Sequence, residues 1–232
     1  MKKIARFALP PAILLLLVVP TFAKTNSRFE VYGAVSFPQN KAFEITVPQS
    51  TVPIKGTQKF SLGGRGGIRL GADGIGHWGQ DLCYSYGTNP TKIVTDLGSF
   101  GFTSRTHQFS YNALWYPRKV TDKGKVFPYL TAGVGGAFYQ LSQTTINEAL
   151  DPNRAGLGQL RNENVFTFNA GGGLRFRVNS VYGFRIDVRD NMSRAVRYGL
   201  PRSSSDPKAT VFPISGIFHQ IEVSLAFIYY FK

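Results

Sequence analysis

Histidines beside hydroxyl-bearing side chains are the features of this chain with the most chemical potential. His107 and Ser110 come closest to a catalytic spacing, in which an imidazole activates a hydroxyl nucleophile. Three positions apart, the two side chains point to opposite faces of a regular strand. His77 lies at an expected turn and His219 near a strand end, and strand parity places no carboxylate to orient any of them. We therefore expect no catalytic residues and no enzymatic activity.

The sequence also gives little support for a metal site or a phosphate-binding site. The single cysteine, Cys83, excludes an intramolecular disulfide, and no Cys/His spacing matches a metal site. Three glycine clusters lie at residues 63–67, 133–136 and 171–173. None of them matches a phosphate-binding loop or opens a helical pattern. We expect the second and third clusters, which lie on adjacent strands, to pair at mid-height, where glycines let a narrow barrel bend and leave room for neighbouring side chains. We expect no metal and no cofactor.

The type of secondary structure that positions these side chains is clearest in the C-terminal residues 217–231. Every second residue there is large and apolar, with the exception of His219. Strict alternation predicts a strand with one apolar and one polar face. From Ile221 onward the pattern covers about ten residues, which is enough for a tilted strand to cross a bilayer.

Eight such segments follow one another along the chain, and long and short connections alternate between them. This rhythm predicts an all-β fold: an eight-stranded antiparallel up-and-down transmembrane barrel, with long loops on one side and turns on the other. The even strand number places both termini on the turn side, which we expect to be periplasmic. The expected strands cover residues 29–37, 59–70, 78–86, 105–116, 127–141, 165–178, 181–188 and 217–231.

A soluble β-sandwich would also show alternation. Aromatic residues at strand ends, such as Trp78, Tyr84 and Tyr86, instead favour the interfacial girdles of a membrane barrel. The polar faces then line a lumen that side chains can fill, and buried charges there must pair. The expected lumen network consists of Arg65, Arg69, Asp81, Arg175, Arg177, Arg185, Asp187, Arg189 and Glu222.

The N-terminus fits an exported protein. A basic start, an apolar core at residues 12–19 and a small-x-small site at residues 21–23 predict a cleaved signal peptide over residues 1–23, and residues 24–232 form the barrel domain. An uncleaved anchor is the weaker alternative, because the apolar core is short. The formal charge of +14 could indicate a nucleic-acid binder, but export favours the phosphates of outer-membrane lipid and lipopolysaccharide. We expect a monomer.

The whole mature chain resembles the small outer-membrane barrels of the OmpA/OmpX type. Tyr229 and Phe231 resemble their C-terminal assembly signal, although Lys232 follows, and the resemblance implies insertion into the bacterial outer membrane by the barrel assembly machinery. Because the last strand pattern runs to the end of the sequence, we expect no peptidoglycan-binding domain of the kind found in OmpA. Some related barrels, the lipid A deacylases, use a His and a Ser two residues apart, a pattern from which His107 and Ser110 depart.

This resemblance leaves the role open, because one fold serves several functions. We expect a non-enzymatic envelope structural or surface-interaction protein that acts through long extracellular loops. Residues 188–217, for example, combine several arginines with few acids. A narrow small-solute channel and a lipid-modifying outer-membrane enzyme are the alternatives.

Overall fold

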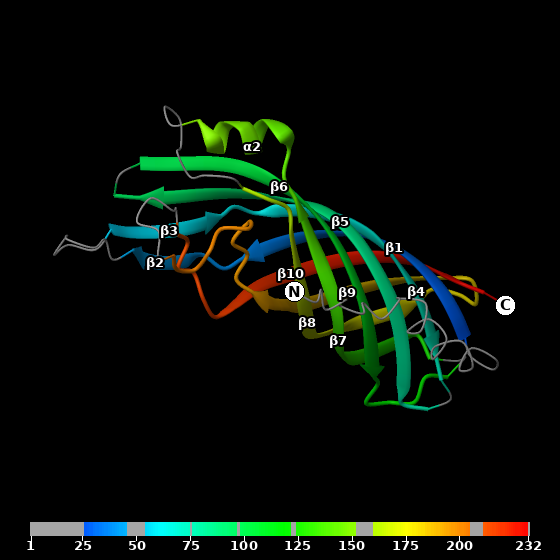
Figure 1. Ribbon diagram of the computed structural model, residues 1–232. Helices are drawn as coiled ribbons and strands as arrows, with labels where there is room; N and C mark the ends of the chain where they lie inside the picture. Colours follow the sequence, from blue (N-terminus) through cyan, green and yellow to red (C-terminus); the bar gives the residue numbers. More distant parts are fainter. Residues whose placement is uncertain are drawn as a thin grey trace, which may run out of the picture.

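The described part of the chain consists of ten β-strands and one helix (Figure 1). The computed structural model describes residues 26–45, 54–74, 76–96, 98–121, 124–151, 160–204 and 211–231, so the predicted signal peptide lies outside it. The elements are β1 (Asn26–Pro38), β2 (Lys41–Ile45), β3 (Ile54–Phe60), β4 (Gly63–Asp73), β5 (Trp78–Thr95), β6 (Gly98–Trp115), β7 (Val126–Gln140), α2 (Gln143–Leu150), β8 (Glu163–Arg177), β9 (Tyr182–Arg194) and β10 (Ile217–Tyr230).

Eight of these strands close into an antiparallel up-and-down barrel, as predicted. β1 pairs with both β4 and β10, so the last strand seals the barrel against the first. The main-chain N–H of Phe231 donates to the carbonyl oxygen of Ser27 at 3.0 Å, so both ends of the described chain meet at the barrel end with the short turns. We call this the turn end and the opposite end, with the long connections, the loop end.

The register fixes the bore of the barrel. A path of paired residues starts at Gly136 on β7, passes once through all the other barrel strands and returns to β7 at Val126. This stagger of ten residues corresponds to strands tilted by about 40°. An eight-stranded barrel of this tilt is just wide enough inside for side chains to fill it.

Two strands are much longer than predicted. β5 and β6 pair without interruption up to Thr95 and Gly98, so the long loop predicted between residues 86 and 105 is wrong. In this outer part the polarity of the faces inverts, because Ile93 and Phe102 are buried inside while Lys92 is exposed outside. A strand that leaves the lipid meets water on its outer face, and the apolar-outside pattern that predicted the other strands ends there.

The remaining long connections also contain structure. β2 and β3 form a hairpin in the predicted loop 37–59, and β3 pairs with the outer part of β5. Lys59 and Phe60 therefore belong to β3, and the predicted strand 59–70 begins only at Gly63. The helix α2 follows β7, and β9 continues to Arg194. In Figure 1 the two hairpins and α2 extend from the loop end.

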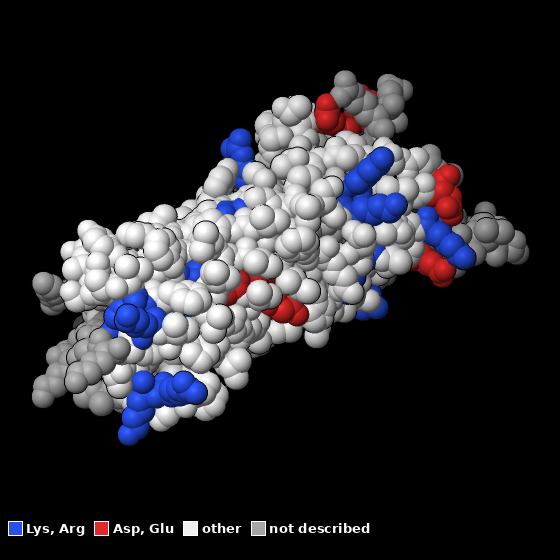
Figure 2. All heavy atoms as spheres, turned by 180° about the vertical axis from the view of Figure 1, so that it is seen from behind, with Lys and Arg blue, Asp and Glu red and all other residues white. Residues whose placement is uncertain are grey.

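The outer wall of the barrel carries a broad apolar band. Outward side chains along the strands are large and apolar, and aromatic ones face each other near the turn end, as in the register pairs Trp78–Trp115 and Tyr182–Tyr229. Figure 2 shows most of the visible charged side chains towards the two ends of the molecule, and the wide white zone between them is interrupted by an acidic group near its middle. None of the described helices has the length and hydropathy of a membrane-crossing helix.

Glycines make room inside the barrel wall for large lumen side chains. A Cβ at Gly173 would lie 2.6 Å from the hydroxyl oxygen of Tyr129 and 2.7 Å from the Cβ of Asp187. Likewise, a Cβ at Gly71 would lie 2.6 Å from the guanidinium of Arg28. The predicted pairing of the glycine clusters of β7 and β8 is wrong, because the register places Gly173 opposite Tyr129 and Gly133 opposite Asn169. Their role is therefore to accommodate neighbouring side chains.

Replacing Gly173 by alanine is expected to lower the free energy of unfolding by about 2 kcal/mol, because the new methyl group overfills a closed site. The measurement is the urea midpoint of the barrel folded into lipid vesicles. Gly64→Ala is the matched control, since a Cβ there meets no atom within 4 Å. Equal midpoints for the two variants would contradict the packing role of Gly173.

Candidate functional site

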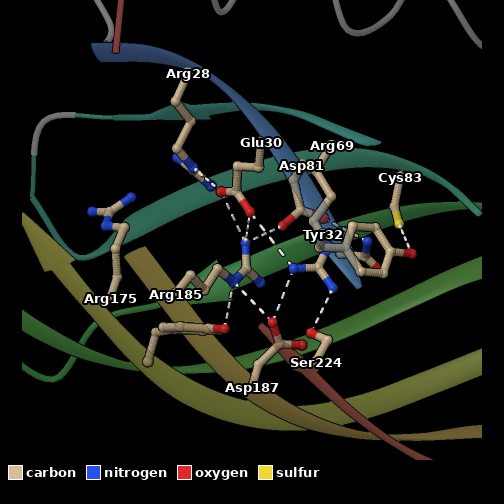
Figure 3. Close-up of polar contacts among 12 residues, drawn as sticks. Arg28, Glu30, Tyr32, Arg69, Asp81, Cys83, Arg175, Arg185, Asp187 and Ser224 are labelled. Carbon is tan, nitrogen blue, oxygen red and sulfur yellow. Dashed lines mark hydrogen bonds and ion pairs between the residues drawn. The ribbon is translucent and has the colours of Figure 1, made fainter. Parts of the chain in front are cut away.

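The centre of the lumen is organised around one arginine of β9. Arg185 lies within 3.2 Å of carboxylate oxygens from Glu30 on β1 and Asp187 on β9, and 3.0 Å from Asp81 on β5 (Figure 3). Its Nε also donates to the hydroxyl of Tyr129 at 2.5 Å. Arg185 and Glu30 are completely buried. One cation is thus shared by carboxylates from three strands, which are brought together only by closure of the barrel.

Two further arginines complete this centre. Arg69 contacts Asp187 at 2.9 Å and Ser224 at 3.1 Å, and its guanidinium lies 3.9 Å from the ring centre of Tyr32. Arg189 contacts the other oxygen of Asp187 at 2.7 Å. Asp187 therefore receives charge-assisted hydrogen bonds through both of its oxygens, the arrangement that stabilises a buried carboxylate best.

A second group of ion pairs closes the lumen towards the turn end. Asp73 contacts Arg28 at 2.6 Å and Arg175 at 2.5 Å, and it accepts a hydrogen bond from the hydroxyl of Tyr116 at 2.9 Å. Arg28 also contacts Glu30 at 2.8 Å, which links this group to the centre. The predicted network lacked Glu30, which lies within a predicted strand, and it lacked Arg28 and Asp73, because the predicted strands ended before these two. Extending the strand parity by a few residues would have found both.

A third group lies towards the loop end. Arg65 contacts Glu222 at 3.2 Å, donates to the amide oxygen of Gln220 at 3.2 Å and forms a short hydrogen bond to that of Gln108. Gln108 in turn donates to Asn191 at 3.0 Å. The cavity between this group and the centre has a volume of about 10 Å³, room for about one water molecule.

Together these groups form one stack of charged layers, which we call the ion-pair cluster. Within the described residues, six arginines contact five carboxylates in it. Its members are Arg28, Arg65, Arg69, Arg175, Arg185 and Arg189 with Glu30, Asp73, Asp81, Asp187 and Glu222.

One residue of the predicted network lies elsewhere. Arg177 lies at the turn end, where it donates to the carbonyl oxygen of Thr121 at 3.1 Å and stacks over the rings of Phe127 and Tyr230. It is two positions beyond Arg175, the last arginine of β8 in the cluster. The alternation along β8 correctly predicts that Arg177 is on the inward side. It does not predict the position of a residue along the barrel axis, which depends on where its strand leaves the barrel.

The loop end is closed by an apolar cluster, which we call the loop-end core. It combines residues from the β2–β3 and β5–β6 hairpins, from β7 and from the connection between β9 and β10. Its largest buried members are Phe43, Ile93, Phe102, Tyr139, Leu141, Leu160, Tyr198, Leu200, Phe212 and Ile214. The long connections therefore fold back over the lumen and bury apolar surface there.

Glu163 fastens this core to the barrel. Its carboxylate accepts hydrogen bonds from the main-chain N–H groups of Arg197 at 2.7 Å and Tyr198 at 2.6 Å, and contacts Arg194 at 3.1 Å. Tyr198 has a positive φ of 54°, an unfavourable conformation that the surrounding contacts stabilise. Burial raises the pKa of the Tyr198 hydroxyl, which contacts the hydroxyl of Ser104 at 3.2 Å.

Comparison with known proteins decides the type of barrel. No protein-family model and no curated protein matches the chain. Among solved structures, the outer membrane protein OprG from Pseudomonas aeruginosa matches with a TM-score of 0.55, over 90% of this chain and 97% of that one, at 14% identity. The fold is that of the small outer-membrane barrels. Neisserial surface protein A matches with a TM-score of 0.44, over 88% of this chain and 97% of that one, at 12% identity.

Among the described residues of this outer-membrane-type barrel, His107 and Ser110 do not form a catalytic pair. His107 is on the outer wall, where its Nδ1 lies 2.9 Å from the Tyr84 hydroxyl, whereas Ser110 is buried in the lumen. His219 was predicted to have no orienting carboxylate, and this is wrong. Its Nδ1 lies 2.6 Å from Asp190, a neighbour that the register of β9 and β10 creates.

The chemistry available to the barrel interior is charge pairing. In the described ranges no group of three or more His, Cys, Asp or Glu side chains could hold a metal ion. Cys83 is buried next to Tyr32, with its sulfur 3.2 Å from the tyrosine hydroxyl. The arginines of the ion-pair cluster are held by carboxylates and amides of the same barrel, so the lumen is a packed polar core.

Proposed function

We propose that this chain is a non-conducting integral outer-membrane protein that acts as an envelope structural or surface-interaction component. The observation that carries the proposal is the filled lumen, in which the ion-pair cluster and the loop-end core lie one above the other. The apolar outer band favours lipid as its environment. The turn end, with both ends of the described chain, then faces the periplasm, and the loop end faces outward.

The loop end supplies the surface for such a role. β2, β3 and the outer parts of β5 and β6 form a four-stranded platform that extends beyond the other strands (Figure 1). β2 is at one edge of this sheet, and an edge strand offers unpaired main-chain groups to a partner. The loop-end core supports the platform from inside, so it can present a fixed shape.

The proposed role is non-enzymatic and monomeric. The histidine hydrogen bonds described above join no nucleophile, base and orienting group in one place. The outward aromatic pair Tyr229 and Phe231, with ring centres 5.4 Å apart, supports recognition of the last strand by the barrel assembly machinery. Lipid and lipopolysaccharide phosphates are the proposed partners of the exposed basic residues at both ends.

Electrical recording in planar bilayers tests the proposal. We expect the inserted full-length protein to give no discrete conductance steps, because neither the ion-pair cluster nor the loop-end core leaves a water-filled path. Heat-modifiable gel mobility of the same sample is the control that the barrel is folded. Reproducible unitary steps from folded protein would instead favour the small-solute channel. Mass spectrometry of lipid A from cells with and without the protein separates both from a lipid-modifying enzyme.

A further inference from the structure

An open groove runs along the outer wall of the barrel, on the face formed by β6, β7, β8 and β9 and the start of β10. Its volume is about 910 Å³, and nearly all of its lining is apolar. This size lies at the upper end of the range of roughly 300–1,000 Å³ for ligand pockets. Ala113 and Ala132 line its floor, and Phe166 and Phe168 line it from β8.

The groove results from a row of small residues in register. Ala113 on β6 pairs with Ala132 on β7, which pairs with Ala170 on β8, and all three point outward. Beside this row, the rings of Phe166 and Phe168 stand edge to face with centres 4.9 Å apart. On a wall that faces lipid, such a depression beside a pair of packed aromatic rings needs an apolar chain to fill it, because an empty groove loses dispersion contacts.

A cation marks the upper end of the groove. Arg194 lines it at the loop end of β9, and 58% of its side chain is exposed although it contacts Glu163 at 3.1 Å. Arg105 is also exposed on β6, but it does not line the groove and lies five residues beyond Ser110, the residue that the register aligns with Ser193 next to Arg194. An apolar groove that ends at an exposed arginine is complementary to a molecule with an acyl chain and an anionic head.

We propose that the groove binds one acyl chain of a phosphorylated lipid of the outer leaflet, with a lipid phosphate held by Arg194. This inference goes beyond the proposed function and rests on its orientation, in which the loop end lies in the outer leaflet. Guanidinium groups suit phosphate because their planar donors form charge-assisted hydrogen bonds to its oxygens. The site would fix one lipid at a defined place on the wall.

Lipid A is the probe for the test. The full-length barrel is folded into phosphatidylcholine vesicles that contain lipid A, transferred to mild detergent, and the retained lipid per barrel is measured by mass spectrometry. We expect about one retained lipid A. Arg194→Gln should lower this retention about tenfold through loss of the charge-assisted contact, and the double variant Ala113→Leu/Ala132→Leu, which fills the floor, should do the same.

Two controls match these variants. Lys92→Gln removes an exposed positive charge on β5, and Val31→Leu enlarges an exposed residue on β1, and neither residue lines the groove. Both should retain lipid A like the parent protein. Dephosphorylated lipid A should bind the parent protein as weakly as native lipid A binds Arg194→Gln.

Three results would overturn the proposal. Equal retention of lipid A by the parent and both groove variants would show that the retained molecules are bulk lipid and are not bound in the groove. Equal retention of phosphatidylcholine and lipid A would remove the role of the phosphate. A dimer in light scattering that the double variant abolishes would identify the groove as an interface between copies. Each result leaves the bilayer conductance unaffected, so failure of the lipid site is distinguishable from failure of the proposed function.

Discussion

Replacing Arg185 by methionine is expected to lower the free energy of unfolding of the barrel by about 4 kcal/mol, since breaking a buried ion pair leaves uncompensated charge. Arg185 is shared by Glu30, Asp81 and Asp187 at 3.0–3.2 Å, and it is completely buried. Methionine fills most of the volume, so lost charge compensation dominates the effect. The measurement is the urea midpoint of the barrel in lipid vesicles, read by heat-modifiable gel mobility.

A double-mutant cycle separates charge pairing from packing. Asp81 contacts Arg185 at 3.0 Å and Arg189 only at 3.7 Å, so Asp81→Asn should also destabilise the barrel. The double variant Arg185→Met/Asp81→Asn should be more stable than the sum of the two single effects predicts, because each change removes the charge that the other leaves unpaired. Lys92→Met, on the exposed side of β5, should leave the midpoint unchanged. An unchanged midpoint for Arg185→Met would contradict a central role for this arginine.

These expectations do not imply that ion pairs are the most stable filling for the lumen. Replacement of a whole buried ion-pair network by well-packed apolar residues is often neutral or stabilising. The polar lumen has a different consequence for the strands. Because β1, β4, β5, β8, β9 and β10 carry charged side chains on the inner face and apolar ones on the outer face, a shift of register by one residue would place side chains such as Arg69 or Asp187 in lipid. The ion-pair cluster thus opposes register errors during closure of the barrel.

The closed barrel was predictable because its strands face lipid on one side and the lumen on the other. Apolar and polar residues therefore alternate along the sequence. Lipid outside and paired charges inside alternate along β8, β9 and β10, and the outward position of Phe227 and the inward position of Glu222 follow from parity alone. The predicted partnership of the last strand with the first is also confirmed. In a closed eight-stranded up-and-down barrel, the free edge of the first strand can pair only with the free edge of the last strand.

Individual partners were not predictable, because they depend on the stagger between strands. Asp190 and His219 come together only in the register of β9 and β10, and Asp73 reaches Arg175 only across the lumen. The structure beyond the apolar band was missed for another reason. Around Ile93 the inner face becomes apolar and the outer face polar, the reverse of the pattern that identified the strands. A search for inverted parity next to a barrel strand would have extended β5 and β6.

Loss of Glu163 is expected to release the loop-end core while the barrel stays folded. In Glu163→Ala the main-chain N–H groups of Arg197 and Tyr198 lose their acceptor, and each hydrogen bond to a charged group contributes about 1.5–3 kcal/mol. In addition, the strain of the positive φ at Tyr198 is no longer compensated by these hydrogen bonds. Amide hydrogen exchange in residues 195–204 should therefore accelerate at least about a hundredfold, which corresponds to about 3 kcal/mol of local stability.

The contrast between two regions makes this prediction specific. Amides of β9 and β10 beside the ion-pair cluster should keep their protection, because Glu163 contacts none of its members. Glu44→Ala removes an exposed carboxylate on β2 and should leave exchange in both regions unchanged. If residues 195–204 exchange at the parent rate in Glu163→Ala, the apolar contacts of Tyr198 with Phe102 and Tyr139 alone hold the core. Even with the loop-end core released, the barrel should remain non-conducting, because the ion-pair cluster closes the lumen below it.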